Sequence, residues 1–247
     1  MSTTIYTSNG KILINGSNNK WLKASEGPGP APIVLPPYTM RMKWKPGYDP
    51  SGTAGPTLTK TCVDAVNNIW DITLPNGSSS STLNWLTQFG GSSGGDQPKI
   101  IEILAVNPGD ATDIHELFYY CTSITSVPLF DTSSCTQCSG LFKECTSLTS
   151  VPQFDLSGCT EYGELFKNCS SLTSIPVVTL NQTVTQIKVP QMYSGCTNIE
   201  TGILNAYNSL SARNLPNEEY YYQCFKNCGS NTVAGAAELA QIPSGWK

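Results

Sequence analysis

Apolar residues recur with a period of about 24 positions through the C-terminal half of the chain. The marker of each unit is a bulky apolar pair followed three residues later by cysteine. These cysteines stand 24, 24, 27 and 32 residues apart, at Cys121, Cys145, Cys169, Cys196 and, more loosely, Cys228. Further Leu, Val and Pro positions keep phase in CTSITSVPLFDTSSC, CTSLTSVPQFDLSGC and CSSLTSIPVVTLNQT. Self-similarity over this many positions predicts repeating structural units.

A single unit of this length cannot bury its own apolar face. Neighbouring units must stack and place each Leu, Val, Phe and Cys over its counterpart, which makes one continuous core. We expect ELFYYC-type segments to form a short helical turn and SVPLFDT-type segments to form a short strand, irregular because proline lacks an amide donor. At the open C-terminal end, Ile242 and Trp246 are candidates to cover the core.

The pattern upstream is that of short strands. TTIYT, KILIN and KWLKA alternate with turn sequences and predict an N-terminal β attachment segment at residues 1–25. Pro and Gly then indicate a linker at 26–37. A small β-rich capping domain is expected at 38–112. Its predicted strands are TMRMKW, NNIWDITL and KIIEILAV. We also expect a short helix in SSSSTLNWLTQF and a flexible loop in GGSSGGD. The repeat array with its C-terminal cap occupies 113–247.

Composition narrows the classes of partner. Charged residues make up 13% of the 247, and the formal net charge is −4, with no basic stripe to attract nucleic acid or anionic lipid. No apolar run approaches the roughly 20 residues that span a bilayer, so we expect no membrane insertion. The N-terminus lacks a basic region followed by an apolar core, which predicts a protein without a secretory signal peptide, while Ser, Thr and Asn suit an extracellular surface. Virion proteins, made in the host cytoplasm and released by lysis, reconcile the two indications.

The repeat also resembles a known family. The segment LFKECTSLTSVPQFDLSGCTEYGELFKNCSSLTSIP is similar to the BspA-type leucine-rich repeats of bacterial surface proteins, over about residues 113–247. Departures from the pattern are Leu for Met in the apolar pair, and Cys135 and Cys159 where Val is usual. The resemblance implies a solenoid used for adhesion and recognition, with no catalytic residues. The fold class expected is therefore β-rich: a short N-terminal β segment and a small β domain, followed by a leucine-rich-repeat-like solenoid with a short strand and a short helical turn per ~24 residues.

A second resemblance concerns the other segments of the chain. PPYTMRMKWKPGYDPSG, NNIWDITL and the ending ELAQIPSGWK resemble proteins encoded by phages and prophages of gut Bacteroidetes. The start GKILINGSNNKWLK is similar to leaders on virion fibre and decoration proteins of such phages. This implies attachment to other virion proteins through the N-terminal segment.

Cysteine chemistry has two interpretations. Cys135-x-x-Cys138 fits a redox or zinc motif, but the chain has one His and Cys138 aligns with Tyr162, which is not a metal ligand. Cysteines equivalent by repeat point the same way, side by side, whereas a disulfide needs Cβ atoms directed at each other. We therefore expect reduced, buried thiols rather than disulfides, with Cys224 and Cys228 in the irregular last unit the weakest case.

The sequence pattern does not indicate a catalytic site. His115 is predicted to be a surface residue, because no nucleophile or second His accompanies it. Asp131 and Asp155 repeat at 24 residues, and turn capping is favoured over a calcium ladder. Glycoside hydrolysis needs a pair of carboxylates, and the sequence indicates no such pair among the glutamates of the array. These glutamates are Glu116, Glu144, Glu161 and Glu164. We expect no enzyme, no cofactor and no metal.

A binding surface is the remaining candidate site. Exposed tyrosines suit recognition of glycans or proteins, although at least half of them could simply cover the seam between repeats. The candidates are Tyr119, Tyr120, Tyr162, Tyr220, Tyr221 and Tyr222. The sequence thus predicts a structural and binding protein of a phage virion, as a head or tail fibre, decoration or receptor-binding component. We expect it to bind a host-surface glycan or protein and to associate as a homo-oligomer through residues 1–37. The alternative is a BspA-like adhesin of the bacterial cell surface.

Overall fold

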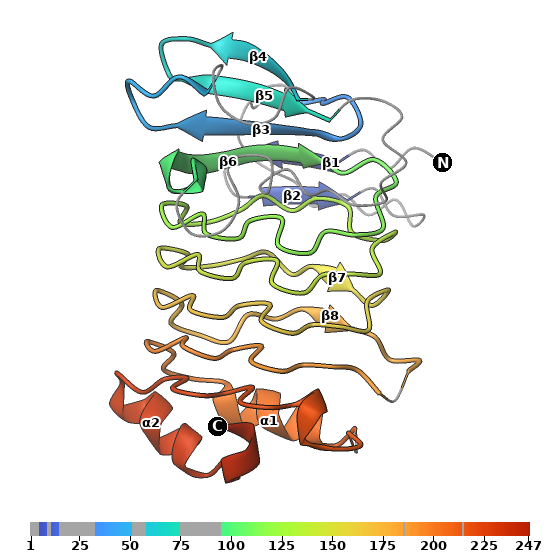
Figure 1. Ribbon diagram of the computed structural model, residues 1–247, viewed down its shortest axis with the longest axis vertical. Coiled ribbons are helices and arrows are strands. Elements are labelled where there is room, and N and C mark those ends of the chain that lie inside the picture. Colours follow the sequence, from blue (N-terminus) through green and yellow to red (C-terminus); the bar gives the residue numbers. More distant parts are fainter. Residues whose placement is uncertain are drawn as a thin grey trace.

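A regular sheet, a stack of turn-rich units and a pair of helices follow one another along the molecule (Figure 1). The computed structural model describes residues 5–8, 11–14, 33–50, 58–74, 95–184, 186–213 and 215–247. The expected strand at 20–24, most of the linker, the short helix of SSSSTLNWLTQF and most of the GGSSGGD loop lie outside these residues.

The predicted strands upstream of the repeats are confirmed where the structure describes them. β1 (Ile5–Ser8) pairs with β2 (Lys11–Ile14) in an antiparallel hairpin. β3 (Thr39–Trp44), β5 (Ile69–Thr73) and β6 (Ile100–Asn107) correspond to the other three expected strands. The sheet also contains β4 (Thr59–Asp64), which the sequence did not indicate.

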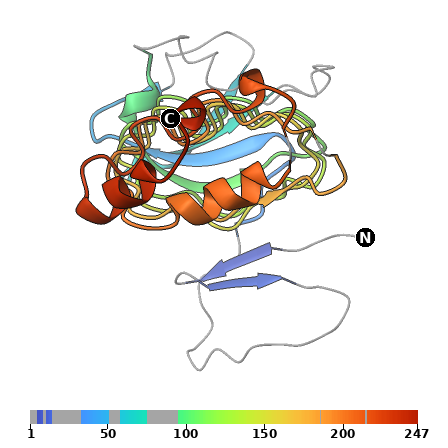
Figure 2. The same ribbon diagram turned by 90° about the horizontal axis from the view of Figure 1, so that it is seen from below.

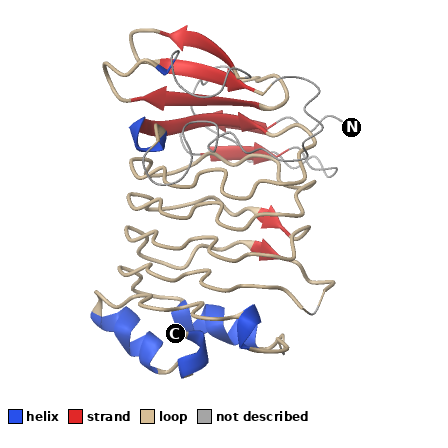
Figure 3. Ribbon diagram, in the orientation of Figure 1, coloured by secondary structure: helices blue, strands red, loops and turns tan. Residues whose placement is uncertain are grey.

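These four strands form one antiparallel sheet in the order β4-β5-β3-β6. Apolar and charged residues alternate along β3, so its two faces differ. Met40, Met42 and Trp44 on one face are fully buried, and Arg41 and Lys43 on the other are half-exposed. The short 3-10 helix η3 (Gln97–Lys99) leads into β6. Figure 3 shows that this sheet contains most of the strand structure of the molecule.

Each repeat unit is built from tight turns that hydrogen-bond to the next unit. In the first unit, the amides of Leu117, Tyr119 and Cys121 donate to carbonyls three residues back. The intervening amides point to the following unit, with Phe118 N donating to Leu141 O at 2.9 Å and Phe142 N to Leu165 O at 2.9 Å. The units consequently lie one above another, and they superimpose when viewed along the stack in Figure 2.

The prediction of a leucine-rich-repeat-like solenoid, with a short strand and a short helical turn in every unit, is wrong. Over the residues that the structure describes, the fold is mixed and sheet-based, with an antiparallel four-stranded sheet and two α-helices. The described repeat units contain only the two-residue strands β7 (Asp155–Leu156) and β8 (Thr179–Leu180), paired in parallel. The in-phase prolines shorten the strands, because Pro cannot donate to a ladder.

Left-handed residues interrupt the backbone of each segment in which a helical turn was expected, so the segment folds as tight turns and not as regular helix. The residue before each apolar pair has positive φ, and so does the residue four positions later, for example Glu116 (54°) and Tyr120 (63°). A left-handed residue every few positions stops any helix after one turn and costs about 1–2 kcal/mol when it is not glycine. The same two positions in the later units are Gly140 and Glu144, Glu164 and Asn168, Gln191 and Gly195, and Gln223 and Asn227.

The core is a set of columns that run along the stack. Phe142 lies parallel to Phe118 and to Phe166, with ring centroids 5.5 Å apart on each side, and Tyr193 and Phe225 continue the column at 5.7 and 5.6 Å. The in-phase cysteines Cys121, Cys145, Cys169 and Cys196 are fully buried as well. Equivalent side chains therefore pack on one another, as the repeat pattern predicted.

The C-terminal end of the stack is closed by helices and aromatic rings. α1 (Ile203–Ser211) and α2 (Val233–Ala240) lie side by side at this end in Figures 1 and 2, with the 3-10 helices η4 (Glu218–Tyr220) and η5 (Ser244–Trp246) nearby. Trp246 stacks on Tyr221 at 4.3 Å and contacts Phe225, the last ring of the column. Ile242 is 2% exposed and Trp246 7%, so both cover the core as expected.

Candidate binding surface of the repeat region

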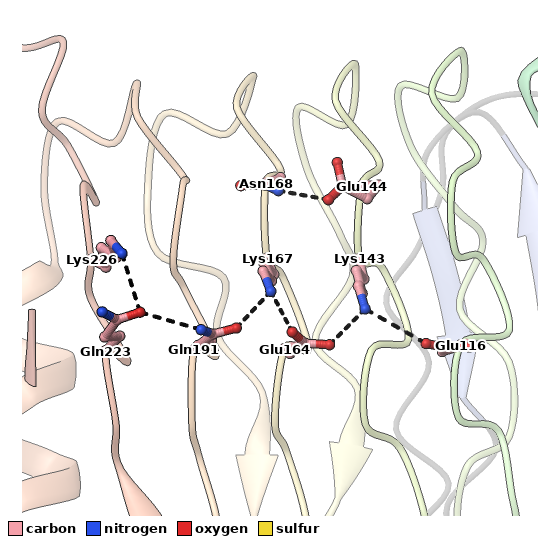
Figure 4. Close-up of polar contacts among 9 residues, drawn as sticks. All are labelled: Glu116, Lys143, Glu144, Glu164, Lys167, Asn168, Gln191, Gln223 and Lys226. Atoms are coloured by element: carbon pink, nitrogen blue, oxygen red, sulfur yellow. Dashed lines mark hydrogen bonds and ion pairs between the residues drawn. The ribbon is translucent and has the colours of Figure 1, made fainter. Parts of the chain in front are cut away.

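A row of polar side chains runs across consecutive units on one side of the stack (Figure 4). Its members come from two positions of the repeat, the left-handed residue before the apolar pair and the residue directly after that pair. The turn at each unit aims both positions at solvent while the apolar pair points into the core. We call this set the polar row, and it consists of Glu116, Lys143, Glu164, Lys167, Gln191, Gln223 and Lys226.

Contacts within the polar row pass from one unit to the next. Lys143 Nζ lies 2.7 Å from Glu164 Oε2 and 3.8 Å from Glu116 Oε1, so one ammonium joins three units. Lys167 Nζ contacts Glu164 Oε1 and donates to Gln191 Oε1 at 2.6 Å. Amides extend the row, since Gln191 Nε2 donates to Gln223 Oε1 at 3.3 Å, and Lys226 Nζ does the same at 3.3 Å.

Glycines leave room for these side chains. Gly140 occupies the left-handed position (φ 64°) between Glu116 and Glu164, and a Cβ there would lie 3.0 Å from the Glu116 Cγ. Gly195 (φ 76°) likewise leaves space for the side chain of Asn168 beside the row, because a Cβ at this glycine would lie 2.0 Å from Asn168 Oδ1. Asn168 itself donates to Glu144 Oε1 at 2.6 Å.

The charges of the polar row stabilise one another. Burial by itself would raise the pKa of Glu164, but the hydrogen bonds from Lys143 and Lys167 outweigh burial, and the pKa is lowered. Burial likewise would lower the pKa of Lys143, but the hydrogen bond and charge of Glu164, with the charge of Glu116, leave it raised. Both groups are therefore ionised at neutral pH. A general acid at neutral pH needs a raised carboxyl pKa, so Glu164 is suited to binding and not to proton transfer.

The tyrosines expected to form a binding surface separate into two groups and one buried residue. Tyr119 and Tyr120 in the first unit lie together, with ring centroids 5.8 Å apart, and Lys143 Nζ lies 5.2 Å from the Tyr119 ring. Their unit and ring contacts place them next to the Glu116 end of the polar row. Tyr162 is fully buried, and its hydroxyl donates to Leu156 O and Cys159 O and accepts from Asn181 N, so it contributes no surface.

The second group lies in the last unit. Tyr222 is 46% exposed, and the Tyr220 ring lies 6.0 Å from Lys188 Nζ. Tyr221 instead packs against Trp246 as part of the C-terminal closure. Of these tyrosines, Tyr119 therefore contacts the polar row through Lys143, whereas Lys188, the contact of Tyr220, is not a member of it. The sequence analysis did not identify the polar row. Its signal was available, because Glu or Gln before the pair and Lys after it recur in phase.

The cysteines of the repeats are buried and unpaired, as expected. Cys145, Cys169 and Cys196 each place Sγ 3.0 Å from the carbonyl oxygen of a Phe in the preceding unit. Burial raises the pKa of Cys135 and Cys196 to about 12, and it also raises that of Cys138. A thiol held protonated in this way is a poor nucleophile and a poor metal ligand.

The other candidate residues have structural contacts. Asp131 and Asp155 accept from the amides of Ser133 and Ser157, which is the predicted turn capping. His115 contacts Asp113 at 2.7 Å on a partly exposed turn. Across the described ranges, no group of three or more His, Cys, Asp or Glu is placed to hold a metal ion, and no helix is long and apolar enough to cross a bilayer.

The polar row presents a fixed line of carboxylates, ammonium groups and amides, with Tyr119 and Tyr120 beside its first unit. Such groups hydrogen-bond hydroxyl and amide groups of a partner, and aromatic rings stack on its apolar faces. Comparison of the chain with protein-family models, with curated proteins and with solved structures gave no match.

Proposed function

We propose that the chain is a structural and binding protein of a bacteriophage virion, and that its polar row is the face that meets a glycan or protein of the host surface. The N-terminal segment would attach it to other virion proteins. The protein would act without catalysis, as a fibre, decoration or receptor-binding component.

The observation that carries the binding role is the continuity of the polar row. Its side chains contact one another between units at 2.6–3.8 Å, so their positions are set before a partner arrives. Preorganised groups lose less conformational entropy on binding, which favours affinity. An extended polar partner would meet similar chemistry at successive units, and this suits a polymer or a repetitive surface.

Support for the virion comes from the resemblance of the upstream segments to phage-encoded proteins. The resemblance of the repeats to BspA-type proteins supports a second candidate, a bacterial cell-surface adhesin. Both candidates use the same face for binding, and they differ in the particle that carries it.

Immunogold labelling with an antibody against residues 113–247, applied to intact phage particles and to cells from the source, separates the two. Gold at one defined site of the particles is the expected result, and its position would distinguish head from tail. Gold on bacterial envelopes, with bare particles, would refute the virion proposal in favour of the adhesin.

A further inference from the structure

The charges of the polar row are largely balanced within the row itself (Figure 4). Its two carboxylates, Glu116 and Glu164, stand against three ammonium groups, those of Lys143, Lys167 and Lys226. Lys143 contacts both carboxylates, and Lys167 contacts Glu164. Lys226 instead donates to an amide oxygen at 3.3 Å. A strongly charged partner would have to displace the ion pairs of the row or bind through Lys226 alone.

The charged groups beside the row are balanced in the same way. Glu161, three residues before Glu164, contacts Lys188 of the next unit at 3.2 Å. Asn168 donates to Glu144 at 2.6 Å, again between units. Attraction of a polyanion or a polycation needs an excess of one sign of charge, and these contacts between opposite charges and amides do not leave such an excess.

A protein partner suits the row poorly. The buried centre of a protein interface is depleted in Lys and Glu and enriched in aromatic residues, Met and Arg. The row consists of Glu, Lys and Gln, while the apolar pair of each unit is buried in the core. The most exposed apolar side chains, Val66, Val177 and Val233, lie in the turn after β4, before β8 and in α2, and none is a member of the row.

A glycan without charged groups matches what the row presents. A hydroxyl both donates and accepts, so it can hydrogen-bond to carboxylates, ammonium groups and amides without altering their charges. Tyr119 and Tyr120 are half-exposed beside the first unit, and their rings can pack on the apolar face of a sugar. We infer that the partner of the polar row is a neutral glycan chain that lies along the stack. This inference rests on the proposed function, because it names the partner of the same face.

The spacing of the units suits an extended chain of sugars. The rings of the core column follow one another at 5.5–5.7 Å. The row repeats with the same units, so its side chains recur at a similar distance. One sugar ring advances an extended glycan by a comparable length, and consecutive sugars therefore meet consecutive units. Affinity should rise with the length of the glycan, because each added sugar makes its contacts without a new association step.

The test is binding of the full chain to host cells that have been treated to remove one class of partner. Periodate, which cleaves the vicinal diols of sugars, should reduce binding at least about tenfold, whereas proteinase K should leave it unchanged. Host polysaccharide separated by anion exchange provides soluble competitors. The unretained, neutral fraction should compete for the chain, and the retained, acidic fraction should not.

Salt dependence is an independent measure of the partner's charge. Between about 0.05 M and about 0.5 M NaCl, affinity should change less than about twofold, because a neutral glycan releases no counterions on binding. Val177→Ala is the control variant, since Val177 lies outside the row and is 67% exposed, and it should bind as the wild type does. Circular dichroism verifies that each variant is folded.

The outcomes separate this inference from the proposed function. Loss of binding after proteinase K, competition by the acidic fraction alone, or a loss of affinity of at least about tenfold in salt would overturn the neutral glycan. If Lys167→Glu still weakened binding in that case, the polar row would remain the binding face, with a protein or an acidic glycan as its partner. Absence of binding to host cells, or equal binding by folded Lys167→Glu, would overturn both.

Discussion

The column of stacked rings predicts the largest single effect on stability. Phe142 is fully buried between Phe118 and Phe166, and a third ring, Phe154, lies 5.9 Å from it. Phe142→Ala would remove the middle of the column and leave a cavity that turns held by hydrogen bonds on both sides cannot collapse to fill.

The magnitude follows from the burial. A buried Phe side chain removes about 150–250 Å² from water, which at about 25 cal/mol per Å² is roughly 4–6 kcal/mol, an upper bound. Large-to-small changes at such sites cost about 3–5 kcal/mol. We therefore expect Phe142→Ala to lower the free energy of unfolding by about 4 kcal/mol. Phe142→Leu, which fills much of the space, should cost less than half of this.

Urea unfolding followed by far-UV circular dichroism measures both values. Val177→Ala is the matched control, because Val177 is 67% exposed, and surface substitutions usually change stability by less than about 0.5 kcal/mol. A loss below about 1 kcal/mol for Phe142→Ala would refute the stacked core.

Two further predictions concern ionisable groups. With a bulky disulfide reagent at pH 8, one thiol per native chain should react quickly, that of Cys62, and all ten should react after unfolding; rapid reaction of several thiols in the native chain would contradict the buried columns. Because the pKa of Glu164 is lowered on folding from its ordinary value of 4.5, its contribution to stability is present above that pH and is lost as the pH falls through the folded pKa. Lys143, with its pKa raised above 10.5, loses its contribution as the pH rises through the folded value. Glu164→Gln should therefore be less stable than the wild type between about pH 5 and pH 10, with the difference shrinking in acid; a pH-independent difference in urea midpoint would refute the ion pairs.

Much of the core could be predicted from the sequence, because the tendency of a side chain to be buried depends mainly on its own residue type. The phase of Leu, Phe and Cys identified columns whose members are buried. The alternation of Met40, Met42 and Trp44 identified β3, since a period of two is specific to a half-buried strand. Ile242 and Trp246 could be assigned to the end of the core because terminal units must cover it.

The local backbone conformation of the turns could not be predicted in the same way. Glu116 and Tyr120 adopt left-handed conformations that these residue types rarely favour, and their amides donate hydrogen bonds to Ser139 O and Lys143 O of the following unit. Gly140, Gly195, Asn168 and Asn227 are the residues at these positions whose types favour a left-handed conformation. The polar row was missed for a related reason, because Lys143 meets Glu116 and Glu164 from other units, and contacts between units do not appear in any one unit.

The most direct test of the account is the binding of the purified chain to host cells, compared with that of Lys167→Glu. Lys167 joins Glu164 to Gln191 at the middle of the polar row, and a glutamate there would repel Glu164 and break the row. Lys45→Glu makes the same charge change on the exposed surface beside the sheet. If the polar row is the binding face, Lys167→Glu should weaken binding at least about tenfold, equivalent to 1.4 kcal/mol, and Lys45→Glu should leave it unchanged. Equal binding by the wild type and both folded variants would contradict the assignment.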